Sequence, residues 1–256
     1  SGCFSKNTQI RLKNNCKKAI SEINVGDILH DGCVVTGIMK YSSADLDIYD
    51  LDDVVVTGCH EIFYKNSWIP VRKHPRSKQI QYKDPFVYCL NTSNKVIKIN
   101  NNVFCDWDNV DDNDLDKIKT HCGDICNKDL HPTLDIGLAV NTKLELETGE
   151  KKCIQAVEIN DILKNNIKVT GIVKIDATKI KHIYQFCFKN TQFVASKNIT
   201  IKGCGLGDNP LLDSKVLKKD YKDKYLYNLV TNKGCFYISN LLIGDYNSGL
   251  EKYMVE

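Results

Sequence analysis

The sequence predicts an all-β protein built from two tandem copies of one domain. Short runs rich in Val, Ile, Thr, Tyr and Phe are separated by Asn, Gly and Asp turns, as around 33–39 and 192–195. Helix-compatible sequence is confined to the acidic stretch 108–119. The tandem follows from an internal repeat, in which residues 7–12 (NTQIRL) recur as residues 141–146 (NTKLEL).

The repeat extends through nearly the whole of each copy. The further matches, at an offset of 134 positions (141 − 7) or with small insertions, are 27–29 with 161–163, 35–38 with 169–172, 88–92 with 227–231, and 106–107 with 245–246. We therefore expect a first domain over 1–110 and a second over 135–256, both of ordinary domain size. The segment between them, 111–134, is expected to be a short, partly helical linker.

Composition excludes several classes of protein. The chain of 256 residues is 42% hydrophobic with 15 glycines, which is typical of a folded protein rather than a disordered one. A net charge of +3 gives no indication of nucleic acid or an anionic membrane as a partner. No apolar run approaches the roughly 20 residues that span a bilayer, and we expect no signal peptide before Cys3.

The twelve cysteines are spread singly along the chain, many of them within apolar strands. This favours buried thiols in a reducing compartment such as the cytoplasm over a disulfide scaffold. One cluster, His121, Cys122 and Cys126 with His131 beyond, lacks a common structural-zinc spacing. A polar linker is preferred to zinc there, and no metal or cofactor is expected. The Lys- and Asn-rich composition is typical of an AT-rich genome, such as that of a protist or a large DNA virus.

The start of the chain carries the residues that suggest a reaction. Cys3 follows Gly2, and residues 57–60 (TGCH) close a β-branched run. A thiol is intrinsically nucleophilic and can attack the carbonyl of its own upstream peptide bond. Gly2 has no side chain, so that bond can bend toward attack at low steric cost. His60 is a candidate proton shuttle for the departing amine; the alternatives are a buried thiol and a satisfied core histidine.

With these features the first copy resembles a Hint domain, the horseshoe-shaped self-processing fold of hedgehog C-terminal domains, inteins and bacterial intein-like proteins. The matching features are Gly2-Cys3-Phe4 with Thr8 and Ile10 after it, Val25-Gly26-Asp27 before a strand, Thr57-x-x-His60, and the terminal hairpin 88–106. The resemblance covers residues 2–107 and reaches 137–247 only through the repeat. It implies that Thr57 hydrogen-bonds around the scissile peptide.

The second copy serves as an internal control. The alignment sets Cys3 against Gly137, Thr57 against Ala195 and His60 against Asn198. The second copy is therefore expected to be a degenerate Hint-like domain that keeps the fold without the reaction. Covering an apolar face of the first copy and docking a partner are both open roles for it.

The same comparison raises two further site candidates. His74 precedes Pro75, and this pair aligns with residues 209–210 (NP). His74 is therefore a candidate auxiliary active-site residue, the alternative being a surface histidine beside a proline turn. Asp106 has a counterpart in Asp245, which favours a structural role such as capping the last hairpin, with catalysis as the alternative.

The function these residues favour is single-turnover self-cleavage. An N-to-S acyl shift at the Gly2–Cys3 bond forms a thioester with the chain's own upstream segment, and water or an unknown small nucleophile or protein partner resolves it. Splicing is disfavoured, because the two copies end in 106–107 (DW) and 245–246 (DY) instead of His-Asn before a nucleophile. No sterol-transfer region is evident. The alternative is a non-catalytic Hint-derived β-scaffold or protein-binding module.

Overall fold

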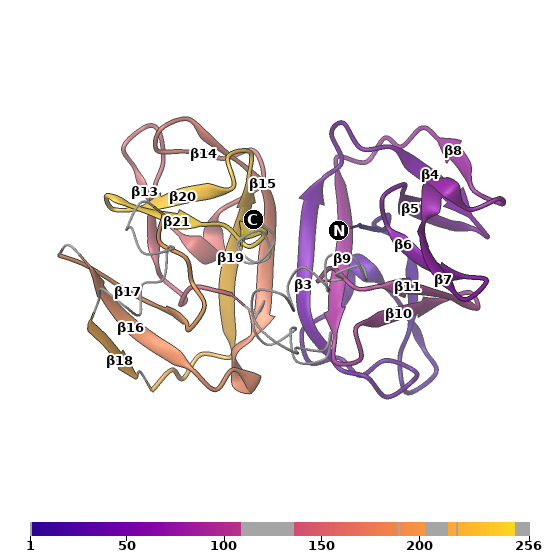
Figure 1. Ribbon diagram of the computed structural model, residues 1–256, viewed down its shortest axis with the longest axis horizontal. Helices are drawn as coiled ribbons and strands as arrows, with labels where there is room; N and C mark the ends of the chain where they lie inside the picture. Colours follow the sequence, from indigo (N-terminus) through magenta and orange to yellow (C-terminus); the bar gives the residue numbers. More distant parts are fainter. Residues whose placement is uncertain (1, 109–135, 189, 203–214, 219, 249–256) are drawn as a thin grey trace. The chain divides into compact units, whose positions relative to one another are not determined.

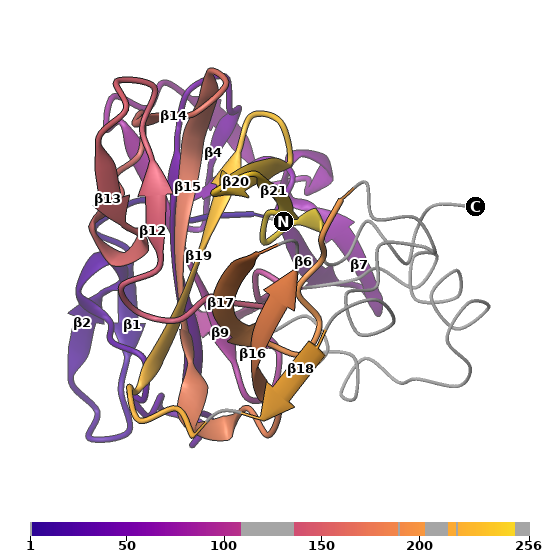
Figure 2. The same ribbon diagram turned by 90° about the vertical axis from the view of Figure 1, so that its left-hand side faces the viewer.

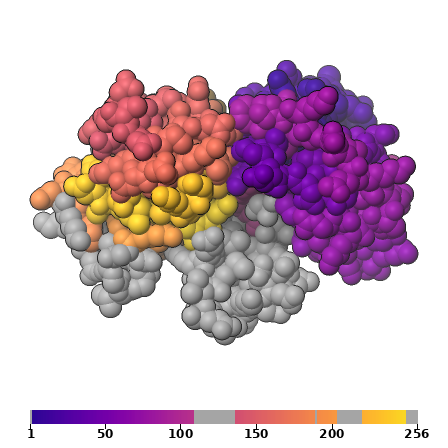
Figure 3. Space-filling view, turned by 90° about the horizontal axis from the view of Figure 1, so that it is seen from above, coloured from indigo at the N-terminus to yellow at the C-terminus, as the bar shows by residue number. Residues whose placement is uncertain are grey.

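A computed structural model describes residues 2–108, 136–188, 190–202, 215–218 and 220–248, which are coloured in Figure 3. These residues form antiparallel strands and short 3-10 turns, so the prediction of an all-β fold is confirmed. The predicted linker 111–134, with its helix-compatible stretch and its Cys/His segment, lies outside the described residues. Among the residues described, no helix has the length and apolar character needed to cross a membrane.

The chain divides into two compact units, residues 1–111 and 112–256, which are described separately. The elements of unit 1 are β1 (Gln9–Arg11), β2 (Lys17–Ala19), η1 (Ile20–Glu22), β3 (Val35–Ser42), β4 (Ile48–Leu51), β5 (Val54–Thr57), β6 (Glu61–Tyr64), β7 (Ser67–Pro70), η2 (Val71–Lys73), β8 (Lys78–Ile80), β9 (Phe86–Thr92), β10 (Val96–Ile99) and β11 (Asn102–Cys105).

Unit 1 combines small antiparallel sheets. The long strands β3 and β9 run side by side (Figure 1), β4 lies between β5 and β8, and a further sheet has the order β10-β11-β6-β7. Three hairpins close through two-residue turns, 52–53, 65–66 and 100–101, in which both residues have positive φ. Five of these six residues are Asn or Asp, which tolerate this conformation better than most residues, and the sixth is Lys65. Turns of this kind match the strand twist.

The apolar core of unit 1 includes a residue from the start of the chain, Phe4. Phe4, Phe104, Leu51, Ile62 and Ile97 are fully buried. The rings of Phe4 and Phe104 meet edge to face with centroids 5.1 Å apart, a favourable arrangement of aromatic rings. The residue after Cys3 is therefore anchored in the core.

Unit 2 repeats most of this arrangement. Its elements are β12 (Lys143–Glu145), β13 (Lys151–Cys153), η3 (Ile154–Ala156), β14 (Ile162–Leu163), β15 (Ile167–Asp176), η4 (Ala177–Lys179), β16 (Ile183–Phe188), β17 (Thr191–Ser196), β18 (Lys215–Lys218), β19 (Tyr225–Thr231), β20 (Cys235–Ile238) and β21 (Leu241–Gly244). Strand β15 runs beside β19 (Figure 2) as β3 runs beside β9.

The register shows how closely the two units correspond. Val35 pairs with Thr92 in unit 1, and Val169 pairs with Thr231 in unit 2; both ladders shift register before the following glycine. The buried ladder dictates this register, because a one-residue slip would turn every core side chain outward. The repeat seen in the sequence is therefore a repeat of strand pairing as well.

Candidate functional site

The Gly2–Cys3 peptide is held between two strands. Phe4 forms single bridges with Val56 of β5 and with Tyr88 of β9. Its backbone N–H donates to the Tyr88 carbonyl at 2.6 Å, and the Thr57 N–H donates to the Cys3 carbonyl at 2.9 Å. Cys3 is therefore placed by backbone pairing on both sides, even though it belongs to neither strand.

Thr57 supplies the acceptor for the amide hydrogen of that peptide. The Thr57 carbonyl accepts from the His60 N–H at 3.1 Å, which turns the chain at the end of β5. The Thr57 hydroxyl takes over the pairing and accepts from the Cys3 N–H at 2.9 Å. The structure thus places Thr57 directly on the nitrogen of the Gly2–Cys3 bond, and both residues are buried.

His60 is buried with one ring nitrogen engaged and one not. Its Nε2 lies 2.7 Å from the carbonyl oxygen of Cys105. A carbonyl can only accept, so Nε2 carries the proton and Nδ1 holds a lone pair. Nδ1 is buried without a hydrogen-bond partner. The ring packs against Phe4 and Phe104, with centroid distances of 4.5 and 5.5 Å. This orientation leaves a neutral base in an apolar setting.

Burial determines the protonation of both candidate catalytic groups. It lowers the pKa of His60 to about 4, against the smaller opposing effect of the backbone groups of Cys105 and Cys3. It also raises the pKa of the Cys3 thiol far above its ordinary value. Desolvation disfavours the charged form of each group. Both are therefore neutral at pH 7: the imidazole can accept a proton and the thiol must lose one to react.

Gly2 packs directly on His60. A Cβ at this position would overlap the Cα, Cβ and Cγ atoms of the histidine. Only glycine allows the peptide to approach the imidazole so closely. The carbonyl that the thiol must attack therefore belongs to the residue against the histidine.

Residues 2–4 form an extended segment whose two faces carry different side chains. Side chains alternate along extended backbone, and Phe4 shares the His60 face with Gly2. The register set by Phe4 puts the Cys3 side chain on the other face, near Thr57 and Cys89. The pKa of Cys89 is raised by burial and also by Cys3, which agrees with their proximity. The imidazole is thus better placed for the departing nitrogen than for the thiol.

His74 is buried in unit 1 beside Tyr64 and Arg76. Its Nδ1 accepts from the Arg76 N–H at 3.1 Å, its ring packs on Tyr64 with centroids 4.4 Å apart, and its Nε2 has no partner. Burial and the charge of Arg76 lower its pKa. The contacts recorded for His74 are not with Cys3 or His60, so an auxiliary role stays a prediction.

Asp106 lies at the end of the terminal hairpin. Its carboxylate accepts from the Thr92 N–H at 3.1 Å and from the Asp108 N–H at 3.2 Å. Burial and the charge of Asp108 raise its pKa. In unit 2, Asp245 accepts from the Thr231 and Ser248 N–H groups at 3.0 and 3.1 Å. The bond from the corresponding threonine occurs in both units and supports a structural role for Asp106 over a catalytic one.

The strand pairing in unit 2 shows that the alignment predicted from the sequence is wrong by one residue at the position of Thr57. Leu138 bridges Ala195 and Tyr227 as Phe4 bridges Val56 and Tyr88, so Ala195 corresponds to Val56. Thr57 therefore corresponds to Ser196 and not to Ala195. The sequence alignment slipped because the β16–β17 hairpin is longer than the β4–β5 hairpin by two residues in each strand.

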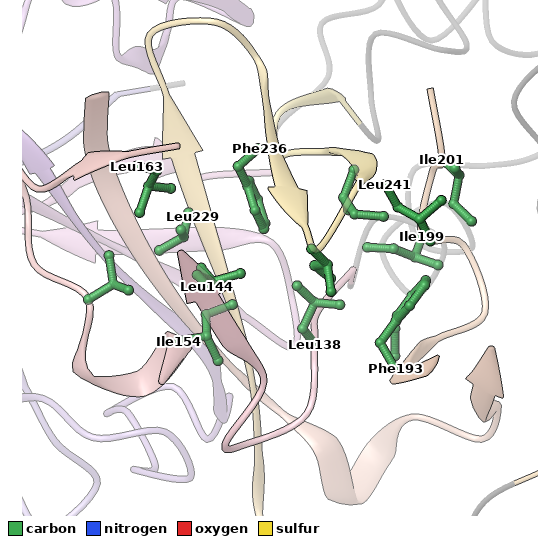
Figure 4. Close-up of a cluster of buried hydrophobic side chains, with 14 of the residues drawn as sticks. Leu138, Leu144, Ile154, Leu163, Phe193, Ile199, Ile201, Leu229, Phe236 and Leu241 are labelled. Atoms are coloured by element: carbon green, nitrogen blue, oxygen red, sulfur yellow. The ribbon is translucent and has the colours of Figure 1, made fainter. Parts of the chain in front are cut away.

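The corrected register shows which groups unit 2 keeps. The Ser196 hydroxyl accepts from the Gly137 N–H at 2.9 Å, as Thr57 does from Cys3. The position of His60 is taken by Ile199, not Asn198. Figure 4 shows Ile199 in the apolar cluster beside Ile201 and Leu241. Unit 2 therefore retains the hydroxyl that holds the peptide, and lacks the thiol and the imidazole.

Two contributors to the site were not singled out from the sequence. The Cys105 carbonyl fixes the His60 tautomer, and a backbone group leaves no signal in the sequence. Cys59 lies within the 57–60 segment, and its sulfur is 3.7 Å from the Thr57 hydroxyl oxygen. Within the described part of the chain, no group of three or more His, Cys, Asp or Glu residues is arranged to hold a metal ion.

Comparison with known proteins gives no family for this chain. No protein-family model matches it, and no curated protein matches it.

Proposed function

We propose that unit 1 is a Hint-like self-processing domain that cleaves the Gly2–Cys3 bond once, with the chain upstream of Cys3 as its substrate. The proposal rests on the groups that surround a single peptide bond. Its N–H is bound by the Thr57 hydroxyl, its glycine lies against His60, and its following thiol is buried beside it. In unit 2 the equivalent hydroxyl–amide hydrogen bond is present without the thiol and the imidazole, so the combination of all three distinguishes unit 1.

The chemistry is an N-to-S acyl shift. The Cys3 sulfur forms a bond to the Gly2 carbonyl carbon, and the carbon–nitrogen bond of the peptide breaks. The nitrogen gains a proton in exchange for the one the thiol loses, so no net proton is consumed. His60 takes up a proton at Nδ1, its lone-pair nitrogen, and gives it to the departing nitrogen, while the Cys105 carbonyl holds Nε2–H in place.

Burial acts on this reaction in two opposite ways. It disfavours the Cys3 thiolate, although the thiol becomes a good nucleophile only after losing its proton. It also strengthens each hydrogen bond made in the site, because the site has low polarity. Thr57 holds the nitrogen in the position from which it leaves. Holding the reacting groups in place in this way raises the reaction rate. Water or another nucleophile then releases the upstream segment from the thioester.

A fusion experiment tests the proposal. A reporter protein is placed before Ser1 of the full chain, and its mass is followed over hours with and without added thiol. We expect release at Gly2–Cys3, none in Cys3→Ala, and a rate at least 100-fold lower in His60→Ala. His30→Ala, at an exposed histidine, is the matched control. A reporter that stays attached under all conditions, in the parent chain as in Cys3→Ala, would support the non-catalytic scaffold instead.

A further inference from the structure

A second thiol lies beside the peptide that unit 1 is proposed to cleave. Cys59 is exposed and stands in the turn between Thr57 and His60. Its sulfur is 3.7 Å from the Thr57 hydroxyl oxygen, the same oxygen that accepts from the Cys3 N–H at 2.9 Å. Because both distances are measured to this one oxygen, the Cys59 sulfur lies no farther from the scissile nitrogen than the sum of the two distances.

The turn that carries Cys59 is held rigidly. Gly58 packs so closely on the Asp47 carboxylate that a Cβ there would overlap it. Asp47 in turn binds the Arg72 guanidinium at 3.0 and 3.1 Å, and the Arg72 N–H donates to the Gly58 carbonyl at 3.0 Å. A rigid turn keeps the sulfur close to the site at low entropic cost.

The Arg72 guanidinium lies within electrostatic reach of the Cys59 sulfur, because the pKa of Arg72 is raised by its hydrogen bond to Asp47 and also by Cys59. By contrast, Cys89 is buried and its pKa is raised well above the ordinary value by burial.

A thioester on Cys3 alone faces a chemical difficulty. Its acyl carbon stays next to the newly formed Cys3 amine, which can attack it and restore the peptide bond. The amide is the more stable product, and the effective concentration of a neighbouring amine is very high. A second acceptor that takes the acyl group to an exposed sulfur would slow this back reaction and open the acyl group to water or an amine, whose attack completes the cleavage.

We propose that Cys59 is this acceptor. The Cys59 thiolate forms a bond to the acyl carbon, the bond from that carbon to the Cys3 sulfur breaks, and the Cys3 sulfur takes up the proton that Cys59 gave up. The acyl group then sits on an exposed thioester, where water or an amine of a partner removes it. This role rests on the proposed self-cleavage. It also explains why unit 2, with Asn198 at the corresponding place, lacks both thiols.

The test uses the reporter fusion of the full chain and its Cys59→Ala variant, with Cys16→Ala as a control at another exposed cysteine. Samples are quenched in acid, digested with pepsin and searched by mass spectrometry for acylated peptides. We expect the acyl group on the Cys59 peptide of the parent chain. In Cys59→Ala, spontaneous release should fall at least 10-fold, and hydroxylamine, which captures the Cys3 thioester directly, should restore it. Cys16→Ala should behave like the parent chain.

Two results overturn the proposal in different ways. If Cys59→Ala releases the reporter as fast as the parent chain, and no acyl group is found on the Cys59 peptide, Cys59 is not an acceptor while self-cleavage stands. If the parent chain forms no hydroxylamine-sensitive bond at all, and Cys3→Ala behaves identically, the proposed function fails and this role fails with it. Circular dichroism and tryptophan fluorescence show whether each variant is folded.

Discussion

The neutral, buried state of His60 predicts a specific loss of stability in acid. In the unfolded chain this histidine has an ordinary pKa near 6.5, whereas burial in unit 1 lowers its pKa to about 4. Between these two values the unfolded chain binds a proton that the folded one does not. The free energy of unfolding should therefore fall as the pH drops from 6.5 to 4, and His60 should have no effect on it above that range.

The size of the loss follows from the pKa difference. Each unit of difference is worth about 1.4 kcal/mol, so the shift of His60 from 6.5 to about 4 should cost roughly 3 kcal/mol when the pH window has been crossed. Other groups, including His74 with its lowered pKa, add their own pH dependence. The His60→Gln variant removes only the contribution of His60, because Gln does not titrate and still carries an N–H for the Cys105 carbonyl.

Urea unfolding at pH 7, 6, 5 and 4.5, followed by tryptophan fluorescence, measures this difference. Both tryptophans of the chain, Trp68 and Trp107, lie in unit 1, so the signal follows that unit. The parent chain should lose at least ~2 kcal/mol more than His60→Gln between pH 7 and 4.5. Equal pH dependence of the two proteins, or an NMR titration that places the His60 pKa near 6.5, would refute the reasoning.

Substitutions at three further positions, Thr57, Asp106 and Gly2, test the rest of the site. Thr57→Val leaves the buried Cys3 N–H without its acceptor and should cost about 1–3 kcal/mol in urea unfolding, whereas Thr57→Ser, which imitates Ser196 of unit 2, should cost under 1 kcal/mol; equal losses would contradict the hydroxyl's role. Asp106→Ala orphans two buried N–H groups and should cost about 2–4 kcal/mol in urea unfolding, and an unchanged transition would contradict the role of the carboxylate. Gly2→Ala forces the peptide away from the imidazole and should slow reporter release about 100-fold, so release at the parent rate would count against the packing described.

Strand content and turns were readable from the sequence because they depend on local patterns. The β-branched runs and the Asn and Asp turns act within a few residues. The prediction that Ala195 is the counterpart of Thr57 is wrong. Hairpin length varies freely at the surface, and matching the sequences does not show how many residues the longer hairpin of unit 2 has gained. Cross-strand pairing with Leu138 fixes it as Ser196.

The site could be predicted in part. The grouping of Cys3, Thr57 and His60 rested on their order and spacing, and the structure brings Thr57 to the Cys3 nitrogen and His60 to Gly2. The tautomer of His60 could not be foreseen, because it depends on a backbone carbonyl 45 residues away. The presence of Asp245 at the position of Asp106 favours a structural role for Asp106, and catalysis stays the alternative.

Hydroxylamine trapping on the reporter fusion is the measurement that tests the central claim most directly. If Cys3 forms a thioester with the upstream segment, the released reporter should end in a Gly2 hydroxamate, and its mass should show this modification only when Cys3 is present. A reporter that is released without the hydroxamate, or that is cut at any other bond, would contradict the account.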